Sequence, residues 1–294
     1  MTENTEKTFE KTEKTERLKP GLYLCATPIG NMGDMTDRVR NTLSAADVIF
    51  CEDTRNSGSM LSRLGIKKRL ESCHAHNEEA AAERIAELVA GGRAVAYISD
   101  AGMPCIADPG ERLVRACIER GIRFEVLPGA SAGLTAAIMS GLPTGRIYFA
   151  GFLPRENRER TELIAEIKRI RATVAVYESP YRVGATFAEL LSVLGDRRAA
   201  LVREITKLYE ETVRGTLSTL AERYKDEPPK GECVIVISGE GGEEASPAES
   251  LDGMLERLLC DGMSVKDAAK QAALLLDVPK SEAYSRANEI KETL

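Results

Sequence analysis

The stretch LYLCATPIGNMGD (residues 22–34) joins a short apolar run to a loop that contains one Pro and two Gly. This order is typical of a buried strand that ends in a ligand-binding loop. A dinucleotide fingerprint would need G-x-G-x-x-G here and a P-loop would need G-x-x-x-x-G-K-[ST], and the loop has neither pattern. The stretch therefore predicts a ligand loop at a strand end that is not an ordinary phosphate cradle.

The same alternation of strand and helix recurs along the chain. Apolar runs at 22–26, 48–51, 94–98 and 124–127 alternate with helix-period stretches at 36–46, 78–90, 110–120 and 131–140. This pattern predicts repeated βα units around a mostly parallel sheet. Further strands at 147–150, 174–177, 199–203 and 234–237, with helices at 158–170 and 181–194, predict a second α/β unit. We expect α/β domains at 18–142 and 143–239.

The remaining segments differ in composition from these two domains. Residues 1–17 alternate Thr, Glu and Lys, which predicts a disordered tail, and residues 240–250 read as an acidic linker. Residues 251–294 predict three helices, at 251–260, 264–275 and 280–292, with Ser264 as an N-cap. Their spacing resembles a helix-turn-helix, but a helical bundle that docks on the main body or on a second subunit fits equally well.

Bulk composition excludes several classes of protein. The net charge of −6 argues against a nonspecific polyanion-binding surface, although charge can be segregated by domain. The seven cysteines include no C-x-x-C pair, so we expect reduced thiols and no metal site. No apolar run approaches the ~20 residues that a bilayer span needs, and the polar start lacks a signal core, so we expect a soluble cytoplasmic protein.

Two more loops share the features of the first one. SDAGMPCIADPG (99–110) and LPGASAG (127–133) also follow apolar runs and are rich in Gly, Pro and small residues. Asp100, directly after its strand, is a ligand candidate, whereas Asp108 either binds a ligand or caps the helix that begins near residue 110. Since open α/β sheets bind ligands at the carboxyl ends of their strands, the three loops predict one crevice.

Nine motifs identify a resemblance that covers residues 20–290. They are TPIGNMGDMTDR, EDTR (52–55), SDAGMPCIADPG, LPGASA, SGLPTG (140–145), GFLPR (151–155), ESPYR (178–182), REITKLYEE (203–211) and KGECVIVISG (230–239). In this order they resemble the ribosomal RNA small subunit methyltransferase I family of the tetrapyrrole methylase fold group. The resemblance implies two α/β domains with a cleft for S-adenosylmethionine between them. It also implies methylation of the ribose 2′-hydroxyl of a cytidine in the decoding region of 16S rRNA, on the assembled small subunit, by a homodimer.

The resemblance also assigns cofactor-binding residues. They are Pro28, Ile29, Asp100, Met103, Ile106, Ser131, Ala132, Tyr177 and Cys233. Tetrapyrrole-acting members tend to have Gly-Asp-Pro in the second loop and Gly-x-Gly-x-Gly in the first. This chain has Ser99-Asp100-Ala101-Gly102 and Thr27-Pro28-Ile29-Gly30-Asn31 instead, which favours the RNA branch.

Catalytic and RNA-binding candidates follow from chemistry. A ribose hydroxyl is a weak nucleophile, so a general base would help, and the candidate catalytic residues are Glu52, Asp53, Glu204 and Lys207, with Glu178 as a further base candidate. Ordinary ion pairs, such as Asp53 with Arg55 or Arg203 with Glu204, explain these residues as well. The candidates for phosphate contacts are Arg55, Arg155, Arg182, Arg203 and Lys207, with Tyr181 or Tyr209 for base stacking.

Two other functions remain open at the level of the sequence. One is a tetrapyrrole methylase, which would leave the C-terminal helices without a purpose. The other is a non-enzymatic nucleic-acid-binding regulator, which would leave the three ligand loops unexplained.

Overall fold

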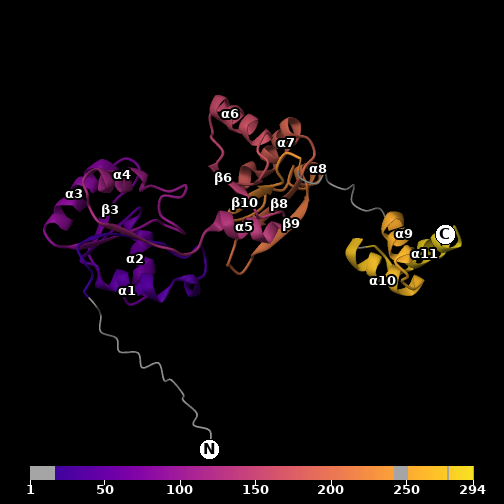
Figure 1. Cartoon of the computed structure of the whole chain (residues 1–294), viewed down its shortest axis with the longest axis horizontal. Coiled ribbons are helices and arrows are strands. Elements are labelled where there is room, and N and C mark those ends of the chain that lie inside the picture. Colours follow the sequence, from indigo (N-terminus) through magenta and orange to yellow (C-terminus); the bar gives the residue numbers. More distant parts are fainter. Residues whose placement is uncertain (1–16, 242–250, 277, 294) are drawn as a thin grey trace, which may run out of the picture.

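The computed structural model describes residues 17–241, 251–276 and 278–293. The predicted tail lies outside the described residues except for Arg17, and so does the predicted linker except for Glu240 and Gly241. Two five-stranded sheets, each with its own helices, make up the main body, and three further helices form a separate bundle (Figure 1). The α/β class expected from the alternating pattern is confirmed.

The first sheet is wholly parallel, in the order β3-β2-β4-β1-β5. Its strands are β1 (Gly21–Cys25), β2 (Val48–Cys51), β3 (Leu70–Ser72), β4 (Ala94–Ile98) and β5 (Phe124–Leu127). The helices beside it are α1 (Asp37–Ala45), α2 (Thr54–Arg63), α3 (Glu78–Ala90) and α4 (Glu111–Glu119).

Alternation of side chains builds one core on each face of this sheet. Tyr23 and Cys25 of β1 point to the core under α1 and α2, whereas Leu22 and Leu24 point to the core under α3 and α4. The first half is therefore an α/β/α sandwich whose central strands are buried on both faces.

The second sheet is mixed, in the order β6-β7-β10-β8-β9. Its strands are β6 (Ile147–Phe152), β7 (Thr173–Glu178), β8 (Arg198–Arg203), β9 (Glu211–Thr216) and β10 (Cys233–Ile237). β6 and β7 are parallel, while β10 pairs antiparallel with both β7 and β8. One face is covered by α6 (Asn157–Lys168), α7 (Val183–Leu194) and α8 (Leu217–Arg223).

Helix α5 (Ala132–Ser140) covers the other face of the second sheet. It precedes the boundary expected at residue 142, yet Ala136 packs in one core with Ala175, Val202 and Val236 of the second sheet. Ile29, from the loop after β1, belongs to this same core. The two halves are thus joined by a shared apolar layer as well as by the chain.

The C-terminal helices are α9 (Leu251–Cys260), α10 (Val265–Leu276) and α11 (Lys280–Thr293). Their buried residues, among them Leu255, Ala272 and Ile290, form a core of their own. The Ser264 hydroxyl accepts a hydrogen bond from the Asp267 amide at 3.2 Å, which confirms the expected N-cap. No helix in the described part of the chain is long and apolar enough to span a bilayer.

Four of the α-helices and strands were not expected from the sequence: α2, α8 and the two edge strands β3 and β9. β3 is only three residues long and half exposed, and β9, with the sequence ETVRGT, lacks an apolar run. α2 has the polar sequence TRNSGSMLSR and buries little besides Leu61. Short polar elements at an edge lack the periodicity that identifies buried ones.

Candidate functional site

The three loops predicted to form one crevice do meet at the carboxyl edge of the first sheet. The Thr27 amide donates to the Gly102 carbonyl oxygen at 2.8 Å, and the Gly102 amide donates to the Thr27 carbonyl oxygen at 3.1 Å. At Gly129, a Cβ would lie 2.6 Å from the Cβ of Ala26, so the third loop lies directly against the first. The prediction that these loops converge is confirmed.

The second loop is held in a fixed shape by buried groups. The Tyr97 hydroxyl donates to the Pro109 carbonyl oxygen at 2.9 Å, and the Glu78 carboxylate accepts a hydrogen bond from the Gly110 amide. The carboxylate at the start of α4 is therefore that of Glu78 from α3 and not that of Asp108. The interpretation of Asp108 as the helix cap was wrong. Asp108 is half buried in this loop.

A loop of the second half faces the first loop. At Gly30 a Cβ would lie 2.6 Å from Lys207 Cγ and 3.0 Å from the Ile205 carbonyl oxygen, so only glycine allows this approach. Lys207 Nζ lies 2.9 Å from Glu204 Oε1 and 2.9 Å from Glu232 Oε2. This ion-pair network fixes the loop, and the hydrogen bond from the Glu232 amide, together with Lys207, lowers the pKa of Glu204.

Backbone strain is concentrated in the second loop and in the loop of the second half that holds Lys207. Within residues 17–241, 251–276 and 278–293, the non-glycine residues with a left-handed φ are Cys105, Ala107, Glu204 and Thr206. Such conformations cost about 1–3 kcal/mol each and cluster at functional sites. The coincidence makes the junction of the three loops with the loop at residues 204–207, called the cleft below, the candidate functional site.

Aromatic side chains line the second half of the cleft. The Tyr177 hydroxyl accepts a hydrogen bond at 3.1 Å from the amide of Gly133, near the start of α5. The Tyr177 ring makes edge contacts with Phe149 and Phe152, and burial raises the pKa of its hydroxyl. Tyr177 thus links β7 to the third loop, where Ser131 and Ala132 are half buried.

Of the remaining cofactor candidates, four lie in the converging loops and one does not. Pro28 and Ile29 lie in the first loop, while Met103, half buried, and Ile106, exposed, lie in the second. Cys233, however, is buried in the core under α6–α8, on the face of the second sheet opposite Ile29. Its neighbour Val234 faces the shared layer instead, so Val234 rather than Cys233 lies on the same face of the second sheet as Ile29.

Carboxyl groups gather at the ends of β2 and β4. Asp100 is exposed and accepts a hydrogen bond from the Asn56 amide group at 2.9 Å. Burial and the charge of Asp100 raise the pKa of Glu52, and burial raises that of Asp108 to about 6. In the described part of the chain no group of acidic, His and Cys residues could hold a metal ion.

The other acidic candidates are tied to basic partners. Asp53 caps α2, lies 2.9 Å from Arg55, and has its pKa lowered to about 2 by the hydrogen bond from Arg55. The fully buried Glu178 accepts a hydrogen bond from Thr186 at 2.8 Å and lies 2.6 Å from Arg182. Glu178 has no open side for a substrate.

The RNA-binding candidates differ in solvent exposure and in whether an ion pair holds their side chains. Arg155 is exposed, and Arg55 is 89 % exposed despite its ion pair. Arg182 is held by Glu178, and Arg203 lies 2.7 Å from Glu211 rather than pairing with Glu204. The rings of Tyr181 and Tyr209 are 85 % and 70 % exposed.

His74 is a neighbour of this site that the sequence did not single out. The Cys73 amide donates to the Cys51 carbonyl oxygen, so His74 follows β3 where Glu52 follows β2. Its Nδ1 is buried without a hydrogen-bond partner. The available signal was that the chain has only two histidines, both in the segment CHAH.

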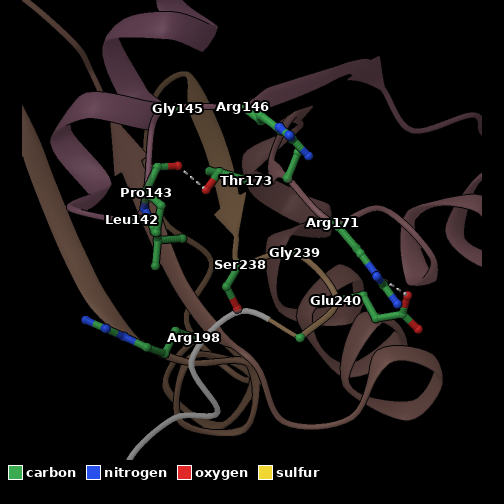
Figure 2. A pocket seen from close by; sticks show the side chains of 12 residues that line it. Leu142, Pro143, Gly145, Arg146, Arg171, Thr173, Arg198, Ser238, Gly239 and Glu240 are labelled. Atoms are coloured by element: carbon green, nitrogen blue, oxygen red, sulfur yellow. Dashed lines mark hydrogen bonds and ion pairs between the residues drawn. The ribbon is translucent and has the colours of Figure 1, made fainter.

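A separate pocket lies at the other end of the second sheet (Figure 2). Arg146, Arg171 and Arg198 surround it, and Arg171 pairs with Glu240 at 3.8 Å. β7 begins there at Thr173, whereas Tyr177 near its opposite end reaches the cleft. The pocket is therefore distinct from the cleft between the two halves.

Comparisons with known proteins agree with the fold. Residues 21–221 match the family model of tetrapyrrole (corrin/porphyrin) methylases, and residues 244–291 match the RsmI C-terminal HTH domain. The ribosomal RNA small subunit methyltransferase I of Halalkalibacterium halodurans is 42 % identical, covering 91 % of this chain and 94 % of the relative. Its namesake from Bacillus subtilis is 38 % identical, covering 90 % and 92 %.

Solved structures support the fold alone. A diphthine synthase superimposes with a TM-score of 0.60 at 16 % identity, covering 74 % of this chain and 89 % of that one. A uroporphyrin-III C-methyltransferase from Thermus thermophilus, in complex with S-adenosylhomocysteine, gives 0.53 at 19 % identity, covering 74 % and 97 %.

Proposed function

The chain belongs to the tetrapyrrole methylase family, and within it to the ribosomal RNA small subunit methyltransferase I group, and from this premise we propose that it methylates the ribose 2′-hydroxyl of a cytidine in 16S rRNA. It is an rRNA methyltransferase that uses S-adenosylmethionine. The tetrapyrrole and non-enzymatic alternatives are not favoured, because relatives that match over nearly their whole length, helical module included, are named rRNA methyltransferases.

The cleft residues fit S-adenosylmethionine chemically. Gly129 and Ala130 expose backbone next to the start of α5, where Ser131 makes no capping hydrogen bond and leaves amides for an anionic group. The exposed Asp100 carboxylate suits an ammonium group, and Ile29 with Tyr177 offers apolar surface. The convergence of these groups at one strained cleft is the observation that carries the proposal.

The protein's contribution to the reaction is mainly positioning. S-adenosylmethionine supplies an electrophilic methyl carbon on a sulfonium. The two halves would bring the ribose hydroxyl close to this methyl donor and exclude water, and such positioning makes a bimolecular reaction effectively unimolecular. Substitutions that move the facing loops apart therefore reduce the rate.

Among the predicted catalytic residues we favour Glu52 as the base. Its raised pKa makes its carboxylate a better proton acceptor than Asp53 or Glu204, whose pKa values are lowered by their partners. Glu52 would accept the proton that the ribose hydroxyl releases on taking the methyl group that S-adenosylmethionine would supply. Lys207 is assigned to holding its loop through Glu204 and Glu232.

For the RNA we assign phosphate contacts to Arg55 and Arg155, which are exposed near the cleft. Arg182 and Arg203 hold Glu178 and Glu211 and so orient their strand ends. We further propose that the substrate is the decoding region in the assembled small subunit, that the protein acts in the cytoplasm, and that it works as a homodimer.

The test is transfer of labelled methyl groups from S-adenosylmethionine to small subunits that lack the modification, with naked 16S rRNA in parallel. Mass spectrometry then locates the labelled nucleotide. We expect a 2′-O-methylcytidine, formed faster on subunits than on naked RNA. A label on a base, or no label in either RNA despite cofactor binding, would overturn the proposal.

Two variants examine the assigned roles in the same assay. Asp100→Asn should weaken S-adenosylmethionine binding roughly tenfold, since a charge-assisted hydrogen bond is lost. Glu52→Gln should leave that affinity unchanged but lower kcat about 10²-fold or more. If Glu52→Gln keeps full kcat, Glu52 is not the base.

A further inference from the structure

A bulge in β6 turns Phe152 toward the cleft. Phe149 lies opposite Ala175 of β7, but the next aligned residue is Gly151, opposite Val176, so Ala150 is an extra residue. Gly151 has a φ of 65°, a left-handed conformation that glycine adopts at little cost in bulges. Because side chains alternate along a strand, the shift places Phe152 on the same face as Phe149.

Without this bulge Phe152 would point to the opposite core. Tyr148 and Ala150, four and two residues earlier, both pack against the core under α6–α8. Instead the Phe152 ring lies edge to face against Tyr177, with centroids 5.3 Å apart, and is still 56 % exposed. A local distortion therefore places a large aromatic ring at the mouth of the cleft, half in water.

A second exposed aromatic ring and an exposed arginine lie near Phe152. Arg182 donates to the Leu153 carbonyl oxygen at 3.4 Å, which ties the segment with Tyr181 to the residue after Phe152. The Tyr181 ring is exposed, and the exposed Arg155 follows three residues after Phe152. Two aromatic rings and a cation thus gather where β6 and β7 end.

We propose that Phe152, with Tyr181 beside it, stacks on an unpaired base of the RNA substrate, while Arg155 contacts a neighbouring phosphate. Proteins that read single-stranded RNA place bases on exposed aromatic rings and hold the backbone with cations. Phe152 contacts Tyr177, and the Tyr177 hydroxyl accepts a hydrogen bond from Gly133 of the third loop. Phe152 therefore adjoins the candidate cofactor site, where the RNA must bind, and an RNA base fits this position better than a second copy of the chain. The inference rests on the proposed function and adds its base-binding surface.

The first test compares Phe152→Ala, Phe152→Leu and Phe152→Trp with the wild type on small subunits. Removing one stack should lower kcat/KM about 10- to 100-fold, mostly through KM, with cofactor affinity unchanged. Leu keeps the apolar volume but not the flat ring and should be impaired like Ala, whereas Trp should restore most of the loss. Ile118→Ala, at a 64 % exposed position on α4, is the matched control and should behave as wild type.

The second test uses the absence of tryptophan from the chain. Phe152→Trp introduces a single tryptophan, which can be excited apart from the eight tyrosines and whose emission should be quenched when an RNA fragment of the target region stacks on it. Ile118→Trp should show no quenching with the same RNA. This readout reports stacking itself and does not depend on turnover.

The outcomes separate this inference from the proposed function. If the wild type methylates no RNA, the proposed function fails. If the wild type is active but Phe152→Ala keeps its KM and Phe152→Trp is not quenched, only the stacking inference is overturned. It is also overturned if Phe152→Ala loses cofactor affinity in parallel with activity, or if its main effect is a change of oligomeric state.

Discussion

The carboxyl group of Asp108 should make the stability of the folded protein depend on pH. Burial raises its folded-state pKa from 3.8 to about 6, and the charge of Glu52 adds to this effect. The folded protein therefore binds more protons than the unfolded chain between about pH 4 and 6, and stability is lost as the pH rises through this window. The folded state is thus more stable with Asp108 protonated than with Asp108 charged.

Asp108→Asn should remove this dependence. Above pH 6 the variant should have a free energy of unfolding roughly 1 kcal/mol higher than the wild type, after discounting for partial exposure, and it should vary less between pH 4 and 6. Denaturant titrations across this range measure both effects. Asp34→Asn, at an exposed position, is the control for the loss of one charge. An unchanged slope in Asp108→Asn would contradict the assignment.

Glu178 is the residue whose loss should damage the second half most directly. Its side chain is fully buried between Arg160, Arg182 and Thr186. Glu178→Gln leaves the guanidinium of Arg182 without its carboxylate and Arg160 with Glu189 alone, so we expect a loss of about 3 kcal/mol in urea denaturation. Glu162→Gln, which breaks the exposed pair with Arg158, should cost under about 1 kcal/mol. Equal stabilities of the two variants would show that the buried network contributes nothing.

For single residues, the sequence predicted the location of the candidate site better than the side chains that take part in it. The aspartate after β4 and the small residues before α5 stand at the cleft because strand ends are visible as apolar runs followed by turn residues. The side to which Cys233 points and the partner of Arg203 depend on sheet register and on β9. β10 is apolar at every position and so does not show which face Cys233 takes, and β9 has no hydrophobic pattern from which its pairing with β8 could be predicted.

Among the elements, the first loop depends on the absence of a side chain at Gly30. A Cβ there would collide with Thr206 Oγ1 at 2.8 Å as well as with the backbone of Ile205. Gly30→Ala should push the two facing loops apart and weaken cofactor binding roughly tenfold, with a loss of about 1–3 kcal/mol in stability. Calorimetric titration with S-adenosylmethionine measures the first effect.

Gly145→Ala provides the comparison for Gly30→Ala, because nothing lies within 4 Å of the Cβ that it adds. It should bind cofactor as the wild type does. If Gly30→Ala binds equally well, the approach of the two loops is not needed for the cofactor site.

Most elements could be predicted because buried strands and amphipathic helices carry a period. Three of the apolar runs match β2, β4 and β5 residue for residue, and the α3 range is also identical. α2 and the edge strands β3 and β9 escaped because they bury little. The packing of α5 on the second sheet was also not predictable, since periodicity shows that a helix has an apolar face but not which sheet covers it.

For the whole molecule, the C-terminal helices should act on the substrate rather than on the fold. Their buried residues pack on one another in a core of their own. Deleting residues 251–294 should therefore leave the melting temperature of the main body and its cofactor affinity unchanged, while raising KM for small subunits tenfold or more. Steady-state kinetics measure the KM.

A chain with Arg286→Ala is the milder companion to this deletion. It breaks the pairing of α11 with Asp252 of α9 and changes only the third module. A deletion variant with wild-type KM would show that the module does not help to bind the substrate.

The position of β10 has a consequence for how the protein is made. This strand is the last of the second sheet along the chain, yet it lies at its centre, between β7 and β8. While the ribosome is still synthesising residues before Cys233, β7 and β8 each have an open edge toward the vacant central position. Domains generally fold as units during synthesis, and unpaired strand edges promote aggregation. We therefore expect nascent chains arrested before β10 to bind chaperones, and those arrested after their residue 237 has left the exit tunnel to be released from them.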